Sequence, residues 1–459
     1  MSSMGDEYDV AYVREEMLEA SPPSAADSGV ILWLRQNLFS TWTNTIATLI
    51  VLYVLYVIIP PFIEFVLTNA VWSGAGRDVC STEAQGGVQP NGWFGACWAY
   101  VDAYFNQFIY GRYPAPERWR VDIVFLLFFG GLTPLVIPQA PYKAINVVFM
   151  LLVFPVVAFI LLTGGNIGYE GFLIPDAWMA PSLLRFAIEY LVITAVIMGI
   201  AYAFDRGSER DPRPTLIAIA AIMAGIAVIL FITGINFGLP FVETSYWGGL
   251  LVTLVIAVTG IVASLPLGIL LALGRASKMP TVRLVSTTFI EFVRGVPLIT
   301  VLFMASVMLP LFVPEHLEPD KLLRALIGIA LFASAYMAEV VRAGLQAIPK
   351  GQYEGAMAVG LKYWQMMRLI VLPQALKITI PNIVNTYIGL FKDTTLVFIV
   401  GIFDLLRTIE VARIDPKWAT PVTSTTGYAV AAMFYLVFCY GMSRYARAME
   451  ARLATGHTR

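Results

Sequence analysis

A stripe of polar side chains runs along one long apolar segment near the C-terminal end of the sequence. Asn382, Asn385 and Lys392 stand at i, i+3 and i+10, with Gly389 at i+7 and Asp393 directly after the lysine. These spacings place the side chains on one face of an α-helix. Charged groups in an apolar medium are costly, so they face a cavity or one another. Lys392 and Asp393 are therefore candidates for binding a solute with both signs of charge, or for holding two helices together.

Two acid–base pairs occur in other apolar segments. Glu291 precedes Arg294 by three positions, and Glu339 precedes Arg342 by the same interval. Residues at this spacing are neighbours on a helix surface, so each pair can neutralise itself. We expect structural pairs near a gate, and direct binding of a solute is the alternative. Pro297 follows Arg294 closely and removes a helix hydrogen bond, which predicts a kink there.

The sequence contains no constellation typical of an enzyme or a metal site. The two histidines, His316 and His457, are far apart, and no G-x-x-x-x-G-K-[ST] loop for ATP phosphates occurs. We therefore predict that this chain has no catalytic residues, no metal ligands and no cofactor of its own.

The composition indicates a polytopic membrane protein. Hydrophobic residues make up 58% of the 459 residues and charged residues 13%, about half the charge of a soluble domain. Runs of about 20 apolar residues can cross a bilayer as helices. We predict ten spans near 44–68, 121–137, 145–163, 183–204, 214–233, 247–274, 285–311, 322–342, 375–400 and 426–446. Residues 1–43 lack the apolar core of a cleavable signal peptide, so the first span is expected to be retained. This composition excludes an ordinary nucleic-acid-binding protein.

The distribution of lysine and arginine predicts the orientation. With the N-terminus in the cytoplasm, 18 of the 30 basic residues fall on the cytoplasmic side and nine outside. The other three, Arg185, Arg294 and Lys392, fall inside spans. Basic residues favour the cytoplasmic side, so both termini are expected to lie there.

Two of the three cysteines share one predicted external loop. Cys80 and Cys97 lie in the loop after the first span, and Cys439 lies in the last span. Oxidising compartments favour disulfides, which predicts a Cys80–Cys97 bond. Two free thiols are the alternative.

An amphipathic segment separates two of the predicted spans. A short helix is predicted from Gln352 to Val359, and Gly360 fits the left-handed position that ends a helix. A second helix is predicted from Lys362 to Leu372, after which Pro373 breaks the pattern. We expect Tyr353, Ala356 and Met357 on one face of the first helix, and Trp364, Met367 and Val371 on one face of the second. The segment could rest on lipid headgroups. Its small residues favour insertion into a groove of another protein.

The same segment carries a spaced motif. Its members are Glu354, Gly355, Ala356, Gly360, Ile370, Leu372 and Pro373. The pattern resembles the E-A-A-x3-G-x9-I-x-L-P loop of ABC-importer permeases, with Gly355 in place of one alanine. In that family the loop forms a coupling helix that docks into a cleft on a cytoplasmic ATPase subunit. The resemblance implies this role for the motif residues.

The resemblance covers residues 247–447 and is closest to the amino-acid-uptake branch of these permeases. The stretches that carry it are YWGGLLVTL (246–254), EFVRGVPLI (291–299), AYMAEVVRAGLQAIPKGQYEGA (335–356) and GLFKDTTL (389–396). GACWAYV (95–101) and RYP (112–114) further resemble the longer permease subunit of general L-amino-acid importers. The implied fold is an all-α membrane protein of about ten transmembrane helices with a C-terminal type I permease core of five to six helices.

The resemblance and the predicted spans together give a domain organisation. Residues 1–43 form a cytoplasmic tail, and residues 44–246 a transmembrane extension with an external loop at 69–120. Residues 247–447 form the permease core, and residues 448–459 a second cytoplasmic tail.

The resemblance also implies a set of partners. These are a second permease subunit, expected to be a shorter paralogue, two ATP-binding cassette subunits that bind ATP and Mg²⁺, an external amino-acid-binding protein, and the bilayer of a bacterial inner membrane. A second copy of this chain is the alternative to the paralogue. In such a complex the permease would form the translocation path and perform no covalent chemistry.

Two other classes of function stay open on the sequence. A secondary transporter driven by an ion gradient could use Lys392 and Asp393 within broken helices. A structural membrane scaffold is the other class. The spans before residue 247 contain no motif that we can connect to chemistry.

Overall fold

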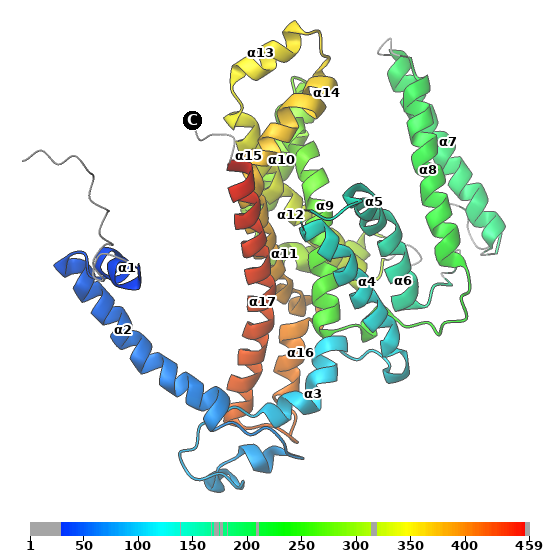
Figure 1. Cartoon of the computed structure of the whole chain (residues 1–459). Coiled ribbons are helices and arrows are strands. Elements are labelled where there is room, and N and C mark those ends of the chain that lie inside the picture. The colour runs from blue at the N-terminus through cyan, green and yellow to red at the C-terminus, as the bar shows by residue number, and fades with distance from the viewer. Residues whose placement is uncertain are drawn as a thin grey trace, which may run out of the picture. The chain divides into compact units, whose positions relative to one another are not determined.

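The computed structural model describes residues 29–137, 139–166, 168, 174, 178–180, 182–207, 211–313 and 319–454. Within these residues the regular structure is helical, as predicted, and the β contacts are isolated bridges such as Gly111 with Trp247. Figure 1 shows the helices along the chain. The chain divides into two compact units, one with Met1–Ala70 and Trp93–Ala96, the other with Val71–Gly92 and Cys97–Arg459.

The first unit contains one long apolar helix. α1 (Gly29–Asn37) precedes α2 (Trp42–Ile63), which continues through the π-helical turn η2 (Glu64–Thr68). The Thr41 side chain accepts a hydrogen bond from the Asn44 backbone N–H at 3.2 Å and so caps α2. No residue of α2 is buried within the chain. Such a uniformly apolar and exposed helix is suited to lie in lipid.

The second unit contains the remaining helices. Before the predicted core they are α3 (Trp98–Tyr110), α4 (Arg118–Val136), α5 (Lys143–Val148), η6 (Phe149–Val153), α6 (Phe154–Thr163), α7 (Leu183–Gly207) and α8 (Arg213–Gly234). Within it they are α9 (Gly249–Arg275), α10 (Pro280–Gly295), α11 (Leu298–Phe303), η8 (Met304–Met308), η9 (Leu309–Leu311), α12 (Lys321–Ala347), α13 (Lys350–Ala358), α14 (Tyr363–Met366), η11 (Met367–Val371), α15 (Leu372–Asp393), η12 (Thr394–Val400), α16 (Leu405–Ala412) and α17 (Pro421–Ala454). The short turns η3 (Arg77–Cys80), η4 (Glu83–Gln85), η5 (Ala115–Glu117) and η7 (Thr244–Tyr246) lie in connecting segments.

The spans agree with the prediction except at two places. The described residues contain nine helices that are long and apolar enough to cross a membrane, and the pair 280–295 and 298–311 gives a tenth span if it is counted as one. This pair is bent by 106°, so residues 285–311 are not one straight helix. The bend lies next to Pro297, where the sequence predicted a kink. The ninth predicted span begins earlier than residue 375, because helix runs from Tyr363 to Val400.

The core of the second unit is built on close packing of α9 against α12. A Cβ atom at Gly268 would lie 2.7 Å from the Met337 Cβ, which shows how near the two helices approach. On its other side, α12 meets α15, where a Cβ at Gly344 would lie 2.7 Å from the Ala375 carbonyl oxygen. Small residues at helix contacts allow this approach in membranes. The centre of the core therefore consists of three closely packed helices, α9, α12 and α15.

The helices α3 and α16 pack against the N-terminal end of α9. A Cβ at Gly249 would lie 2.2 Å from the Phe108 carbonyl oxygen of α3. The Tyr100 hydroxyl donates a hydrogen bond to the Ile409 carbonyl of α16 at 3.3 Å. Figure 1 shows α3 and α16 at the end of the α9–α12 pair that is opposite to α13 and α14. α3, which precedes the core in the sequence, thus packs directly on the core.

Candidate coupling and translocation sites

Beyond the end of α12 the predicted first helix and turn are present, but Pro373 does not end the second helix, because helix continues from Tyr363 to Val400. α13 ends at Ala358, and Gly360 follows with a φ of 77°, the left-handed conformation that the sequence predicted. The Gly360 N–H donates to the Met357 carbonyl at 2.9 Å, and the Leu361 N–H donates to the Ala356 carbonyl at 3.1 Å. These two bonds form a Schellman motif. The turn between the helices is therefore fixed by its own backbone.

A small apolar cluster holds α13 against the rest of the unit. Ala356 is buried with Met366, Met367 and Val371, and Tyr353 packs against them. The Tyr353 hydroxyl also donates to the Leu345 carbonyl at 3.2 Å. Burial and the loss of water around this group raise the pKa of Tyr353. The buried side of α13 thus packs against α12 and α14.

The two predicted faces are only partly covered by the neighbouring elements. Met357 is 59% exposed and Trp364 is 65% exposed, whereas Ala356, Met367 and Val371 are buried. The helical spacing shows which residues share a face, but the width of that face depends on the neighbouring elements. Here α12 and α15 cover only the part of each face that contains Ala356, Met367 and Val371.

The motif residues divide between the two sides of this segment. Glu354, Gly355 and Gly360 are exposed, and nothing lies within 4 Å of a Cβ built at either glycine. Ala356 is buried, Ile370 and Leu372 are half-buried, and Pro373 is exposed in the first turn of α15. The exposed members form an open surface of small residues, and the buried members hold it in place.

The polar stripe on α15 faces away from the chain's own core. Asn382, Asn385 and Lys392 are exposed, and the space around Gly389 is open. Ile383 and Leu390 lie on the opposite, buried face of the same helix. The structure therefore confirms that the stripe occupies one helix face, and the described residues leave that face uncovered.

Lys392 and Asp393 do not pair with each other. Within the described part of the chain Lys392 forms no ion pair, and its side chain is exposed. Asp393 is half-buried at the end of α15. A lysine on an uncovered transmembrane face is costly in lipid, so this face is suited to water or to another subunit.

A cluster of charged residues joins three helices near the end of α12. Glu339 of α12 lies 2.7 Å from the Arg275 Nη1 of α9 and 2.7 Å from the Arg342 Nη2 of its own helix. Arg294, one residue before the end of α10, is 3.7 Å from the same carboxylate. The Arg294 guanidinium also lies 5.5 Å from the centre of the Tyr336 ring. One carboxylate therefore connects α9, α10 and α12.

The predicted pairing of Glu291 with Arg294 is wrong, whereas Glu339 pairs with Arg342 as expected. Glu291 binds Arg275 instead, at 2.8 Å. Arg275 stands at the C-terminal end of α9, where it reaches both acids, and Arg294 turns to Glu339 and Tyr336. No motif or helical spacing in the sequence singled out Arg275. Arg275 stands at the end of an apolar run, and this position indicates a charged residue at the end of a span. The sequence does not show which acidic residues it binds.

The loop that the sequence predicts to be external contains the predicted pair of cysteines as a disulfide. Cys80 and Cys97 are bonded, with 5.8 Å between their Cα atoms, and both are fully buried. Cys439 is a free thiol in α17. The Cys97 N–H donates to the Thr426 Oγ1 of α17 at 3.0 Å. The closed loop is therefore attached to the start of the last span.

Two carboxyl groups near α16 have opposite pKa shifts. Burial raises the pKa of Asp404 to about 7, although its side chain accepts hydrogen bonds from the Leu406 and Arg407 N–H groups at the start of α16. A hydrogen bond from the Tyr104 hydroxyl lowers the pKa of Asp415. The sequence did not single out either carboxyl group, because each pKa shift depends on contacts between distant segments.

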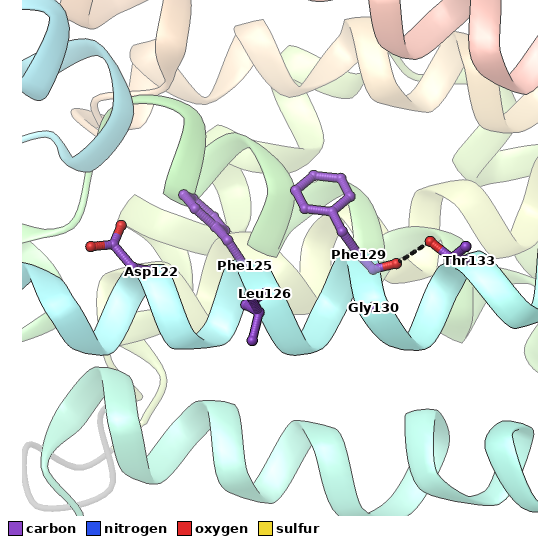
Figure 2. A pocket seen from close by; sticks show the side chains of 6 residues that line it. All are labelled: Asp122, Phe125, Leu126, Phe129, Gly130 and Thr133. Atoms are coloured by element: carbon purple, nitrogen blue, oxygen red, sulfur yellow. Dashed lines mark hydrogen bonds between the residues drawn. The ribbon is translucent and has the colours of Figure 1, made fainter.

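An open groove follows one face of α4. Figure 2 shows its lining from this helix, with the Phe125 and Phe129 rings on the same side. The groove has a volume of about 460 Å³ and is mainly apolar. Asp122, at its outer end, accepts a hydrogen bond from the Tyr110 hydroxyl at 2.6 Å. An apolar face of this kind is suited to lipid and carries no solute chemistry.

Comparisons with known proteins connect these features to a family. Residues 264–455 match the family described as "Binding-protein-dependent transport system inner membrane component". The inner membrane amino-acid ABC transporter permease protein YhdY of Escherichia coli K12 is 40% identical over 437 residues, which are 95% of this chain and 96% of that protein. The chain belongs to the amino-acid ABC transporter permeases. The permease is therefore a multi-pass inner-membrane transport subunit, distinct from the ATPase subunits of such transporters.

A second relative and one solved structure are also similar to the permease. The glutamate/glutamine/aspartate/asparagine transport system permease protein BztC of Rhodobacter capsulatus is 42% identical over 453 residues, which are 98% of this chain and 99% of that protein. A solved structure described as "Crystal structure of an amino acid ABC transporter with histidines" is 28% identical, with a TM-score of 0.39, over 44% of this chain and 92% of that chain. Both long relatives match the permease from end to end, so its N-terminal spans are shared with them.

Proposed function

We propose that the permease forms one half of a path for polar amino acids and that α13 couples this path to a cytoplasmic ATPase. An external binding protein delivers the amino acid, and a second permease, a shorter paralogue, supplies the other half of the path. The Rhodobacter relative is named for glutamate, glutamine, aspartate and asparagine, which supports polar amino acids as the substrate class. ATP and Mg²⁺ are bound by the ATPase subunits.

The geometry of α13 is the observation that carries this proposal. Its buried side is fixed by Ala356 and Tyr353, and its outer side presents Glu354, Gly355 and Gly360. A helix anchored on one side and lined with small residues on the other can enter a cleft without rearrangement. Displacement of α13 is transmitted to α12 and α15 through the apolar cluster. This connection is the mechanical requirement for coupling.

The stripe on α15 supports the position of the path. Asn382, Asn385 and Lys392 need water or a polar partner, and lipid offers neither. A path between two permeases satisfies these groups. The Lys392 ammonium suits the carboxylate of an amino acid, and the Asp393 carboxylate suits its ammonium.

The motion of the path is a shift between two states. ATP binding by the partner subunits favours one state, and release of the nucleotide favours the other. Within the permease, the carboxylate of Glu339 holds α9, α10 and α12 together at one end of the core. We propose that this charge cluster keeps the three helices together while the core moves.

A pair of glycine variants tests coupling directly. Gly360→Val places a branched side chain at a φ of 77°, a conformation that costs roughly 1 kcal/mol or more for residues other than glycine. We expect at least tenfold weaker association with the ATPase and a matching loss of amino-acid uptake in vesicles, with normal membrane insertion. Gly351→Ala is the matched control, because Gly351 lies within α13, outside the motif, and has open space around it. It should retain both activities.

A further variant and a second assay complete the test. Glu354→Ala removes one charge-assisted contact, worth roughly 1.5–3 kcal/mol at most, so it should weaken association while the turn after α13 keeps its backbone conformation. Wild-type association and uptake for Gly360→Val would refute the coupling role of α13. Uptake by the permease alone, driven by an ion gradient in liposomes, would instead support a secondary transporter.

A further inference from the structure

Segments from both halves of the chain line a small cavity near the N-terminal end of α12. Its volume is about 200 Å³, and its polar lining includes Arg112, Thr244, Asp320 and Lys321. Arg112 belongs to the RYP turn after α3, and Lys321 is the first residue of α12. At roughly 30 Å³ for each water molecule, this volume corresponds to about six or seven waters. The cavity has room for one small solute.

The turn that contributes Arg112 is fixed by close backbone packing. Gly111 has a φ of 65° and forms a bridge with Trp247, and a Cβ at this position would lie 2.3 Å from the Gly248 Cα. This contact requires glycine at position 111. The guanidinium of Arg112 then lies 4.6 Å from the centre of the Phe403 ring. Its place at the cavity wall is thus set by the backbone.

Two cations in the cavity wall have no acidic partner. Neither Arg112 nor Lys321 forms an ion pair within the described part of the chain, and both side chains are exposed. The Lys321 Nζ would lie 3.5 Å from a Cβ built at Gly401, so the ammonium lies over that glycine on the opposite wall. Two unpaired cations beside one small cavity favour a ligand with two anionic groups.

The same cavity contains an oriented carboxylate. The Asp320 Oδ2 accepts hydrogen bonds from the Thr244 hydroxyl at 2.8 Å and from the Leu322 N–H at 2.9 Å. These bonds use one oxygen and leave Oδ1 available for a cation. The buried indole N–H of Trp247, which also lines the cavity, has no acceptor among the described residues. An oxygen atom of a bound ligand at this wall would accept a hydrogen bond from the Trp247 N–H.

We propose that this cavity binds a free amino acid with an acidic side chain. Its two carboxylates lie at Arg112 and Lys321, and its ammonium lies at Asp320. The cavity is at the outer ends of the spans in the predicted orientation, apart from the stripe on α15. The site therefore holds the solute between its release outside and its entry into the path. This inference rests on the proposed transport of amino acids and adds a separate receiving site.

Titration calorimetry on the full chain in lipid nanodiscs tests the site with L-glutamate and glutarate, which lacks the ammonium. We expect saturable binding of glutamate, and at least tenfold weaker binding after Arg112→Gln or Lys321→Gln. Asp320→Asn should weaken binding of glutamate but not of glutarate. Lys417→Gln, which removes an exposed lysine in the segment after α16, is the matched control and should bind as the wild type does.

Three results would overturn the receiving site. The first is absence of glutamate binding by the wild-type chain. The second is loss of binding with Lys392→Gln while the cavity variants bind normally, which would place the ligand on the stripe of α15. The third is that the cavity variants weaken only the association of an external binding protein, whose surface carboxylates would then be the occupants. Uptake by the assembled wild-type importer tests the proposed function independently of all three.

Discussion

Arg275 Nη1 lies 2.7 Å from Glu339 Oε1, which joins the end of α9 to α12 across 64 positions of the sequence. Arg275 also binds Glu291 of α10 at 2.8 Å. The α10–α11 pair bends by 106° directly after this contact, so the cluster fixes the α10 side of the bend, and burial of Leu298 and Leu302 in the apolar core holds the α11 side. A bend that is held on both sides is suited to keep α10 and α11 at a fixed angle.

Removal of the central acid should destabilise this arrangement. Glu339→Gln leaves Arg275, Arg294 and Arg342 near one another without their shared carboxylate. Glu339 is only 15% exposed, so we expect a loss of about 1–3 kcal/mol in the free energy of unfolding. Thermal unfolding in nanodiscs measures this loss. Glu410→Gln breaks the more exposed pair with Arg407 and should change stability by less than about 0.5 kcal/mol. Equal effects of the two variants would contradict a central role for Glu339.

Asp404 should make stability depend on pH. Its pKa in the folded chain is about 7, above the value of about 3.9 for an exposed aspartate, because burial disfavours the charged form. The folded state therefore binds the proton more tightly than the unfolded state. This contribution is fully present below pH ~4 and is lost as the pH rises through about 7.

A pair of asparagine variants measures this dependence. Asp404→Asn keeps a good helix cap but cannot ionise, so its unfolding temperature should fall less between pH 5 and pH 7 than that of the wild type. Asp415→Asn is the control, because the pKa of Asp415 is lowered and its titration lies below this window. Identical slopes for the wild type and Asp404→Asn would show that Asp404 is ionised throughout.

The Cys80–Cys97 disulfide should stabilise the external loop. It closes a loop of about 18 residues, for which chain entropy suggests roughly 3 kcal/mol. A membrane-impermeant reductant should therefore lower the unfolding temperature of the wild type and leave a Cys80→Ser/Cys97→Ser variant unchanged. Cys439→Ser should respond as the wild type does, since Cys439 is not in the disulfide. Free thiols at both Cys80 and Cys97, found by mass spectrometry in the non-reduced protein, would exclude the bond.

The predicted orientation can be checked with two single cysteines. Gln85 lies in the external loop, and Lys278 lies between α9 and α10. Both side chains are exposed, so access depends on the side of the membrane. An impermeant thiol reagent should label Gln85→Cys in intact cells and should label Lys278→Cys only after permeabilisation. The reverse pattern would place both termini outside.

Local signals in the sequence predicted the features that depend on a few neighbouring residues. Gly360 ends α13 because the left-handed conformation favours glycine, and the kink before α11 follows from Pro297. Long apolar runs located the spans because their length must match the bilayer. These features need no knowledge of distant parts of the chain.

Features that depend on distant contacts were not predictable in this way. The predicted partner of Glu291 was wrong because its partner in the structure, Arg275, belongs to another helix. Local spacing in the sequence indicated only Arg294, which is three positions away. The spacing of Trp364 places it on one helix face with Met367 and Val371, but the covering elements are narrower than that face, so Trp364 is exposed. The cavity beside Arg112 combines residues from segments that are hundreds of positions apart. Its charges therefore have no common pattern in the sequence.

The hydrogen bond from Cys97 to Thr426 has a consequence for biosynthesis, because it joins residues separated by 329 positions. Synthesis proceeds from the N-terminus, so the external loop is made long before its partner in α17. During this interval the faces of α3 that later contact α16 and α17 have no partner. The contacts of this segment with α17 therefore cannot form until the last span has been synthesised. The order of membrane insertion is thus part of its folding pathway. A chain that ends before residue 426 lacks the Thr426 hydroxyl, so the Cys97 N–H has lost the acceptor that it uses in the complete fold.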